Sequence, residues 1–184
     1  MRNILLCFLY AVQTHSSIIA DYYWRDYEGS IPCDALQGGA DKFGHYTYIG
    51  QVAALDPNSS DLPDIVSAII YKDHEYAYAA YHGRVFKSNK GVKILCTSTP
   101  KKYKWLNSLN SDCTLVRGSF TANYTNFYIG RVNYYGHNVT GRFSTIDQTL
   151  HVPWNDTPNT LQTFKSFEKL MYCGSDNTLV VSPQ

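Results

Sequence analysis

The chain has 184 residues, of which 44% are hydrophobic and 15% aromatic, with 16 Lys and Arg against 15 Asp and Glu. A chain of this length can bury the core of one domain or of two small packed halves. Because the formal net charge is only +1 and no basic stripe stands out, we expect no nucleic acid and no anionic membrane surface among its partners.

The N-terminal residues have the layout of a secretory signal peptide. Arg2 precedes an apolar run over 4–12, which gives way to polar residues. This run is shorter than the roughly 20 residues of a membrane-spanning helix. We predict a signal peptide over 1–20, cleaved after about Ser16 or Ala20, and a secreted, extracellular protein with no membrane span. The alternative is a buried first strand. Cleavage leaves 15 of the basic side chains against 15 acidic ones.

The remaining chain is a duplication. Five landmarks of its first half return in the second half in the same order, most of them at an offset of 80. They are the segments 48–52 and 128–132, Trp24 and Trp105, Cys33 and Cys113, Gly38 and Gly118, and the apolar segments that close on Cys96 and Cys173. We predict repeats over 21–97 and 103–174, joined by a linker over 98–102 and followed by a tail over 175–184.

The local pattern predicts strands. Bulky residues alternate with small or polar ones over 45–52 and 75–81, which is typical of half-buried strands. The apolar spacing over 161–171 also fits a helix, but its end is the repeat partner of the strand-like stretch before Cys96, so we predict a strand there. Turn signals punctuate the chain. They are Gly38-Gly39, 56–58, 89–91 and 135–137. The predicted fold class is all-β, with two tandem, pseudo-twofold-related antiparallel repeats packed as one compact unit.

The cysteines and the sequons agree with export. Cys7 lies in the predicted signal peptide, and an even set of four cysteines remains, which indicates two disulfides. Four cysteines allow three connectivities, and a pseudo-twofold is compatible with all of them. We predict Cys33–Cys96 and Cys113–Cys173, so that each bond closes one repeat. N-glycosylation is predicted on at least two of four sequons. These are Asn58, Asn123, Asn138 and Asn155.

An ordered set of residues resembles the DM-nine repeat. The first half carries Trp24, 29–32, 34–39, Asp41, Gly44 and 48–50, and the second carries Trp105, Gly118, 128–132, 141–142 and 167–170. This resemblance implies a compact tandem β-fold and carbohydrate recognition, because members of the family act as mannose-binding lectins in invertebrate immunity. Those lectins place an acidic residue after a Gly-Gly pair and a Lys in a later Leu-Pro-Gly-Lys segment. Asp41 retains the acidic position and Ile65 stands where the Lys would be, whereas in the second half Thr121 takes the acidic position and Arg142 is basic.

The mismatch between the copies predicts one composite polar cleft between the halves. Asp41 and Arg142 would bond sugar hydroxyls there, and Tyr46, Tyr135 or Trp154 would supply an aromatic face. Against this stands a structural interpretation, in which Asp41 only suits a turn and the aromatic residues form core and cross-strand pairs.

Two functions follow from these observations. The first is a lectin-like recognition protein of innate immunity that binds mannose-type glycans or glycoproteins. The second is an extracellular structural or interaction protein with a degenerate sugar site. Neither is an enzyme. The sequence has no nucleophile elbow, and the acidic tripeptide 73–75 has no second histidine at a metal-ligand spacing, so it indicates an exposed turn. We expect no catalytic residues, no metal and no cofactor.

Overall fold

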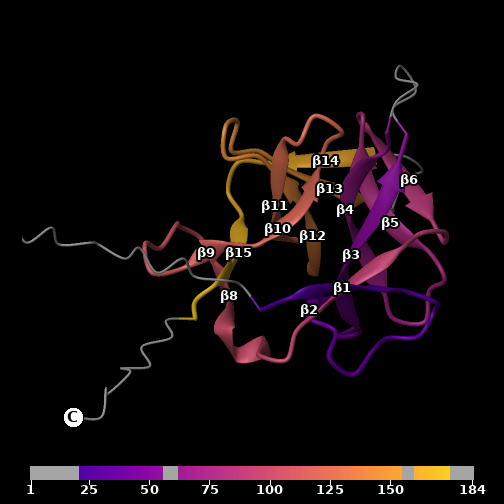
Figure 1. Cartoon of the computed structure of the whole chain (residues 1–184), viewed down its shortest axis with the longest axis horizontal. Coiled ribbons are helices and arrows are strands. Elements are labelled where there is room, and N and C mark those ends of the chain that lie inside the picture. Colours follow the sequence, from indigo (N-terminus) through magenta and orange to yellow (C-terminus); the bar gives the residue numbers. More distant parts are fainter. Residues whose placement is uncertain (1–20, 56–61, 155–159, 175–184) are drawn as a thin grey trace, which may run out of the picture.

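The computed structural model describes residues 21–55, 62–154 and 160–174, and it consists mainly of antiparallel strands (Figure 1). The first half contains β1 (Tyr23–Asp26), β2 (Gln37–Ala40), β3 (Tyr46–Ala54), β4 (Asp64–Tyr71), β5 (Ala77–Tyr81), β6 (Arg84–Ser88) and β7 (Lys93–Cys96). The second half contains β8 (Tyr103–Leu106), β9 (Thr114–Leu115), β10 (Arg117–Phe120), β11 (Asn126–Tyr134), β12 (His137–Phe143), β13 (Leu150–Trp154), β14 (Thr160–Phe164) and β15 (Glu168–Tyr172). A single 3-10 turn, Pro100–Lys102, occupies the predicted linker. The all-β prediction is confirmed. The predicted signal peptide, the C-terminal tail, Asn58 and Asn155 lie outside the described residues.

The two halves pair their strands in the same order. In the first half β1 pairs with β7, β7 with β3, β3 with β2 and β4, and β5 lies between β4 and β6. In the second half β8 pairs with β15, β15 with β11, β11 with β10 and β12, and β13 lies between β12 and β14. The pairing of Ile65 in β4 with Phe120 in β10 joins the two sets, which lie side by side in Figure 1. The pseudo-twofold relation between the halves stays a prediction.

Three strand predictions can be compared directly with the structure. The alternating segment 45–52 corresponds to β3, and 75–81 contains β5, as expected from their period of two. The segment 161–171, whose spacing also fits a helix, falls in β14 and β15. Its end is therefore a strand, and that prediction is confirmed.

The glycine pair Gly38-Gly39 lies within β2, so the prediction of a turn at this position was wrong. A Cβ added to Gly38 would lie 2.9 Å from Thr140 Cγ2, and one added to Gly39 would collide with the Cβ of Asn138. The two glycines therefore let β2 approach β12 of the other half closely. The turn itself begins at Asp41, just after the strand.

Each half also donates a side-chain hydrogen bond to a glycine carbonyl of the other half. Gln51 Nε2 donates to the carbonyl oxygen of Gly118 at 2.7 Å, and Arg131 Nη1 donates to that of Gly38 at 3.1 Å. Donors and acceptors are both related by the repeat offset of 80. Because buried polar groups must find partners, these bonds fix how the halves pack.

The hydrophobic core is likewise shared between the halves. One buried cluster takes members from both, namely Leu36, Ile49, Leu95, Tyr103, Val116, Ile129, Leu170 and Tyr172. A second cluster contains Ile69 of β4 among residues of the second half. Burial of each such side chain stabilises the fold by about 1.5–3 kcal/mol relative to its exposure to water.

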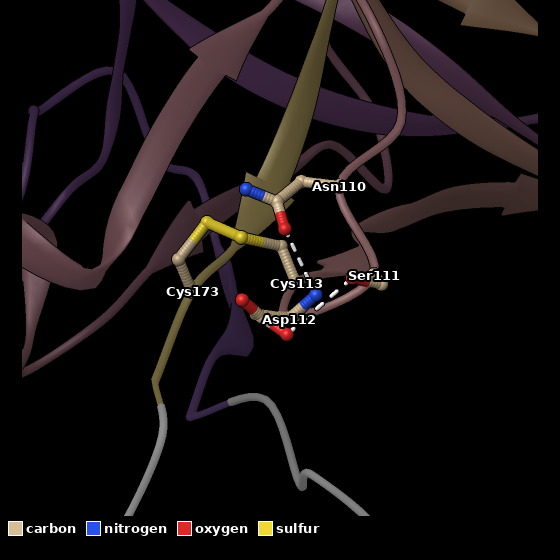
Figure 2. Close-up of a disulfide and its surroundings, with 5 residues drawn as sticks. All are labelled: Asn110, Ser111, Asp112, Cys113 and Cys173. Carbon is tan, nitrogen blue, oxygen red and sulfur yellow. Dashed lines mark hydrogen bonds between the residues drawn. A yellow bond between two sulfur atoms is a disulfide. The ribbon is translucent and has the colours of Figure 1, made fainter.

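One of the two predicted disulfides is present. Cys113 and Cys173 are bonded, which ties the turn that begins at Asn110 to the residue after β15 (Figure 2). The turn is closed by the Cys113 N–H, which donates to the Asn110 carbonyl at 3.1 Å, and by the Asp112 N–H, which donates to Asn110 Oδ1 at 2.9 Å. The bond spans 60 positions of the sequence, nearly the whole second half.

The predicted Cys33–Cys96 bond is absent, and both residues are free thiols. The register explains the difference. Leu95 pairs with Trp24 as Leu170 pairs with Trp105, so Leu95 and Leu170 are equivalent. Cys96 is therefore equivalent to Met171, which lies two residues before Cys173. Cys96 is buried in the core, while Cys33 is exposed in a turn. Burial, together with the neighbouring Asp34 carboxylate, raises the pKa of the Cys96 thiol to about 11, which keeps it protonated and unreactive at neutral pH.

The two sequons that the structure describes differ in their surroundings. Asn123 is exposed in the turn between β10 and β11. Asn138 is half-buried in β12, faces Gly39 of β2, and accepts a hydrogen bond from Asn133 Nδ2 at 3.2 Å. The Thr140 of its sequon is buried. A glycan on Asn138 would therefore interfere with the packing of β2 on β12.

We accordingly expect protein expressed in eukaryotic cells to carry a glycan on Asn123 and none on Asn138. Glycopeptide mass spectrometry before and after peptide-N-glycosidase treatment measures the occupancy of each site. An Asn138→Gln variant with unchanged gel mobility serves as the control. A glycan on Asn138 in correctly folded protein would contradict the prediction.

Candidate functional site

A cleft of about 260 Å³ lies where the turns of the first half meet β12 and β13 of the second. We call it the interhalf cleft and define it by its lining residues. These are Asp41, His45, Tyr46, Tyr71, Lys72, His74, His137 and Trp154. It therefore contains three of the five predicted ligand-binding residues, namely Asp41 and Tyr46 of the first half and Trp154 of the second. That they bind a ligand stays a prediction.

Asp41 organises the turn between β2 and β3. Its Oδ1 accepts hydrogen bonds from the backbone N–H groups of Phe43 at 2.8 Å and His45 at 2.9 Å, and its Oδ2 lies 3.1 Å from His45 Nδ1. Burial acts against ionisation of this carboxyl, but the backbone hydrogen bonds from His45 and Phe43 and the His45 imidazole outweigh it and lower the pKa of Asp41. The carboxylate is thus largely committed to its own turn, and its side chain is only 15% exposed.

Aromatic rings from both halves line the cleft. Trp154, at the end of β13, is buried and meets the His137 ring edge-on, with centroids 5.2 Å apart. Tyr135, in the β11–β12 turn, has its ring centroid 6.1 Å from that of Trp154, and Tyr135 is 75% exposed. On the first-half side, Tyr46 is half exposed. Tyr135 has a φ of 49°, a left-handed conformation that is unusual for an aromatic residue, so the turn holds its ring beside the cleft at a conformational cost.

Arg142, the fifth predicted ligand-binding residue, lies elsewhere, so the predicted Asp41–Arg142 pair was wrong. Arg142 lies five positions after His137 in β12, which is about 16 Å along the strand. Because side chains alternate between the two faces of a strand, this odd separation puts the two side chains on opposite faces. Its guanidinium lies 4.7 Å from the Phe127 centroid and 5.7 Å from that of Tyr81. Burial lowers the pKa of Arg142, whereas the neighbouring Asp64 acts to raise it.

The Arg142 environment corresponds by register to the interhalf cleft. Strand β4 corresponds to β12 and β5 to β13, because Ile69 pairs with Tyr78 as Arg142 pairs with His151. In this alignment Asp64 is equivalent to His137, and Tyr81 is equivalent to Trp154 of the cleft. There Asp64 Oδ1 accepts the Ala122 N–H at 2.8 Å, and its Oδ2 accepts the Tyr81 hydroxyl at 3.3 Å. These bonds tie together the walls of this second site.

The turn near this second site repeats the Asp41 turn without its acid. Thr121 N–H donates to the Thr125 carbonyl at 3.1 Å, just as Asp41 N–H donates to the His45 carbonyl at 2.9 Å. The Thr121 hydroxyl accepts the Thr125 N–H at 3.1 Å, in place of the Asp41 carboxylate. Threonine can therefore hold this turn with no charge.

Several lining residues carry no signal in the sequence, above all Lys72 and His137. Lys72 follows β4 and His137 opens β12, so nothing in their spacing of 65 positions indicates that they meet. The tripeptide 73–75 is exposed, as predicted for a turn. Although three imidazoles and a carboxylate line the cleft, no three His, Cys, Asp or Glu side chains of the described residues are grouped so that they could hold a metal ion.

The fold and the cleft define a class of β-proteins whose two similarly paired halves share a buried hydrophobic cluster and together line a cleft. A family model for the DM9 repeat matches residues 62–161, more than half of the chain. The chain belongs to the DM9 repeat family. The matched region starts just before β4 and ends in β14, so it includes Lys72, His137 and Trp154. A search of curated proteins finds no match. No helix among the described residues has the length and apolar character needed to cross a membrane.

Proposed function

We propose that this protein is a secreted, lectin-like recognition protein that binds carbohydrate in the interhalf cleft without catalysis. The observation that carries the proposal is the convergence of polar side chains and aromatic rings from both halves in one small cleft. Ligand sites combine apolar walls with a few placed polar groups, and sites for drug-sized ligands measure about 300–1,000 Å³. A cleft slightly below this range suits one sugar ring.

Several features support the extracellular part of the proposal. The apolar run over 4–12 after Arg2 has the layout of a signal peptide. The Cys113–Cys173 disulfide is compatible with an oxidising compartment. Membership of the DM9 repeat family is consistent with a recognition role.

The second candidate is an extracellular interaction protein with a degenerate sugar site. Its specific support is the fate of the residues that the resemblance assigns. Arg142 lies outside the cleft, Ile65 pairs with Phe120 inside the sheet, and the Asp41 carboxylate is committed to its turn. We give the first candidate preference because other residues, Lys72 and His137, supply polar groups in the same cleft.

Replacement of Tyr46 tests the lectin proposal. Because this exposed ring can stack against the C–H face of a sugar, we expect Tyr46→Ala to weaken glycan binding by about tenfold. Glycan-array binding of the secreted protein first identifies a ligand, and biolayer interferometry then gives the affinity of each variant. The matched control is Tyr124→Ala, which removes an 82% exposed tyrosine from the turn of the second half. Equal affinity of both variants and the wild type would place the binding site elsewhere, and absence of binding to any glycan would favour the second candidate.

A further inference from the structure

We infer that the sugar bound in the interhalf cleft is acidic, carrying a carboxylate or a sulfate, rather than neutral. This inference rests on the proposed function and names its ligand class. Recognition of a neutral sugar depends on planar carboxylate or amide groups that bond adjacent hydroxyls. Among the residues that the structure describes, the lining contains no Asn, Gln or Glu, and its one acid, Asp41, already accepts two backbone hydrogen bonds and faces His45.

The cleft instead presents a cation. Lys72 is exposed at the end of β4 and has no hydrogen bond or ion pair with any residue of the described segments. Its ammonium group carries three donors and no acceptor, so it matches an anionic oxygen better than a sugar hydroxyl. With Asp41 committed to its turn, this ammonium is the charge in the lining that remains available to a ligand.

The neighbouring residues add donors and positive charge. His74 and His137 bring imidazoles to the same cleft, each of which can donate a hydrogen bond to an anion. Lys42 stands on the Asp41 turn, where its Nζ lies 5.2 Å from the Phe43 centroid. The opposing charges nearby are Asp73 and Glu75, which flank His74 after β4, and both are exposed and absent from the lining.

The arrangement orients an acidic sugar in one way. The ring would lie against the exposed Tyr46 and above the buried Trp154, and its anionic group would point to Lys72. The ion pair supplies charge-assisted bonding, and the aromatic faces supply contact with the ring. Because Lys72 is exposed, the pair would be screened by salt.

The test uses the full secreted protein and soluble polymers that carry mannose, glucuronic acid, N-acetylneuraminic acid or galactose 6-sulfate. In 50 mM NaCl we expect at least one acidic polymer to bind tenfold or more tightly than the mannose polymer, and its affinity to fall in 500 mM NaCl. Lys72→Gln should weaken acidic binding by about tenfold. The matched control is Lys104→Gln, an exposed lysine in β8 outside the cleft lining, which should bind like the wild type. Thermal unfolding of both variants verifies that they are folded.

Each other outcome overturns a specific claim. Tighter binding of mannose than of every acidic polymer, abolished by Tyr46→Ala and unaffected by Lys72→Gln, overturns this inference and leaves the proposed function standing. Acidic binding that Lys72→Gln and Lys104→Gln weaken equally overturns the assignment to the cleft. No binding of any polymer overturns the proposed function and the inference together. Acidic binding that depends on Lys72 supports the inference and also identifies the group. Binding of carboxylated polymers alone identifies uronic or sialic acids, binding of the sulfated polymer alone identifies sulfated sugars, and binding of both identifies the charge itself.

Discussion

We expect Cys113→Ser to lower the free energy of unfolding by about 4 kcal/mol relative to the oxidised wild type. The Cys113–Cys173 bond closes a loop that spans 60 positions, and it restricts the unfolded chain over almost the entire second half. A loss of this size lowers the melting temperature by roughly 10 °C in a domain of this length. Urea denaturation followed by tyrosine and tryptophan fluorescence measures the change.

Two further variants make the disulfide prediction specific. The double variant Cys113→Ser with Cys173→Ser should match the single variant, because the two residues share one bond. Cys33→Ser should change stability by no more than about 0.5 kcal/mol, because its thiol is exposed and free. If Cys33→Ser destabilises the protein as strongly as Cys113→Ser, then Cys33 is bonded after all and the structural assignment fails.

Gly141→Ala should destabilise the protein by about 3 kcal/mol or prevent folding. Gly141 lies in β12, opposite Gly130 of β11, and an added Cβ would collide with the backbone carbonyl oxygen of His151. A side chain could rotate away from such a contact, but this backbone atom cannot, because Arg142 pairs with His151 at the next position. The strain therefore falls on the β12–β13 pairing.

The first half supplies the control for Gly141. Ala68 pairs with Gly50 as Gly141 pairs with Gly130, so a methyl group is accepted at the corresponding position. Ala68→Gly should cost only about 1 kcal/mol, mainly through the flexibility of glycine in the unfolded chain. Differential scanning calorimetry of both variants compares the effects. A Gly141→Ala variant as stable as the wild type would mean that β12 and β13 pack less closely than the structure shows.

Local patterns predicted most of the fold, because the strands are encoded by neighbouring residues. The alternation over 45–52 predicted β3, and the correspondence of the segment before Cys173 with the segment before Cys96 predicted β15. Local patterns failed at Gly38-Gly39, because the sequence does not distinguish a glycine pair in a turn from one in a strand that lets another strand approach closely. The Cys33–Cys96 prediction failed because Cys96 lies two residues earlier in its repeat than Cys173 does. Cys96 is therefore buried in the core, whereas Cys33 lies in an exposed turn.

The candidate site was predictable only in part: Asp41, Tyr46 and Trp154 were expected and line the cleft, whereas the other lining residues were not expected. Asp41 and Tyr46 flank a turn within a single hairpin, and a family resemblance pointed to the acid. Lys72 and His137 line the same cleft because β4 of the first half packs against β12 of the second, and this packing is a tertiary contact that no local pattern encodes. The prediction that Arg142 lies in the cleft failed for a related reason. Whether a residue is an odd or an even number of positions from His137 decides which face of β12 its side chain occupies, and this register is not visible in the sequence.

The exchange of hydrogen bonds between the halves has a consequence for how the chain folds. Gln51 must find Gly118, which lies 67 positions later, and Gly38 must find Arg131, which lies 93 positions later. During synthesis the first half therefore emerges with Ile49 and the Gly38 carbonyl still lacking the partners that the second half supplies. Contacts at such long separation slow folding, since loop closure precedes the interactions that repay it. Folding is completed only after β15 has been synthesised, because Leu170 and Tyr172 of this strand belong to the shared core. Until then the exposed edge of the first half is open to pairing with other chains.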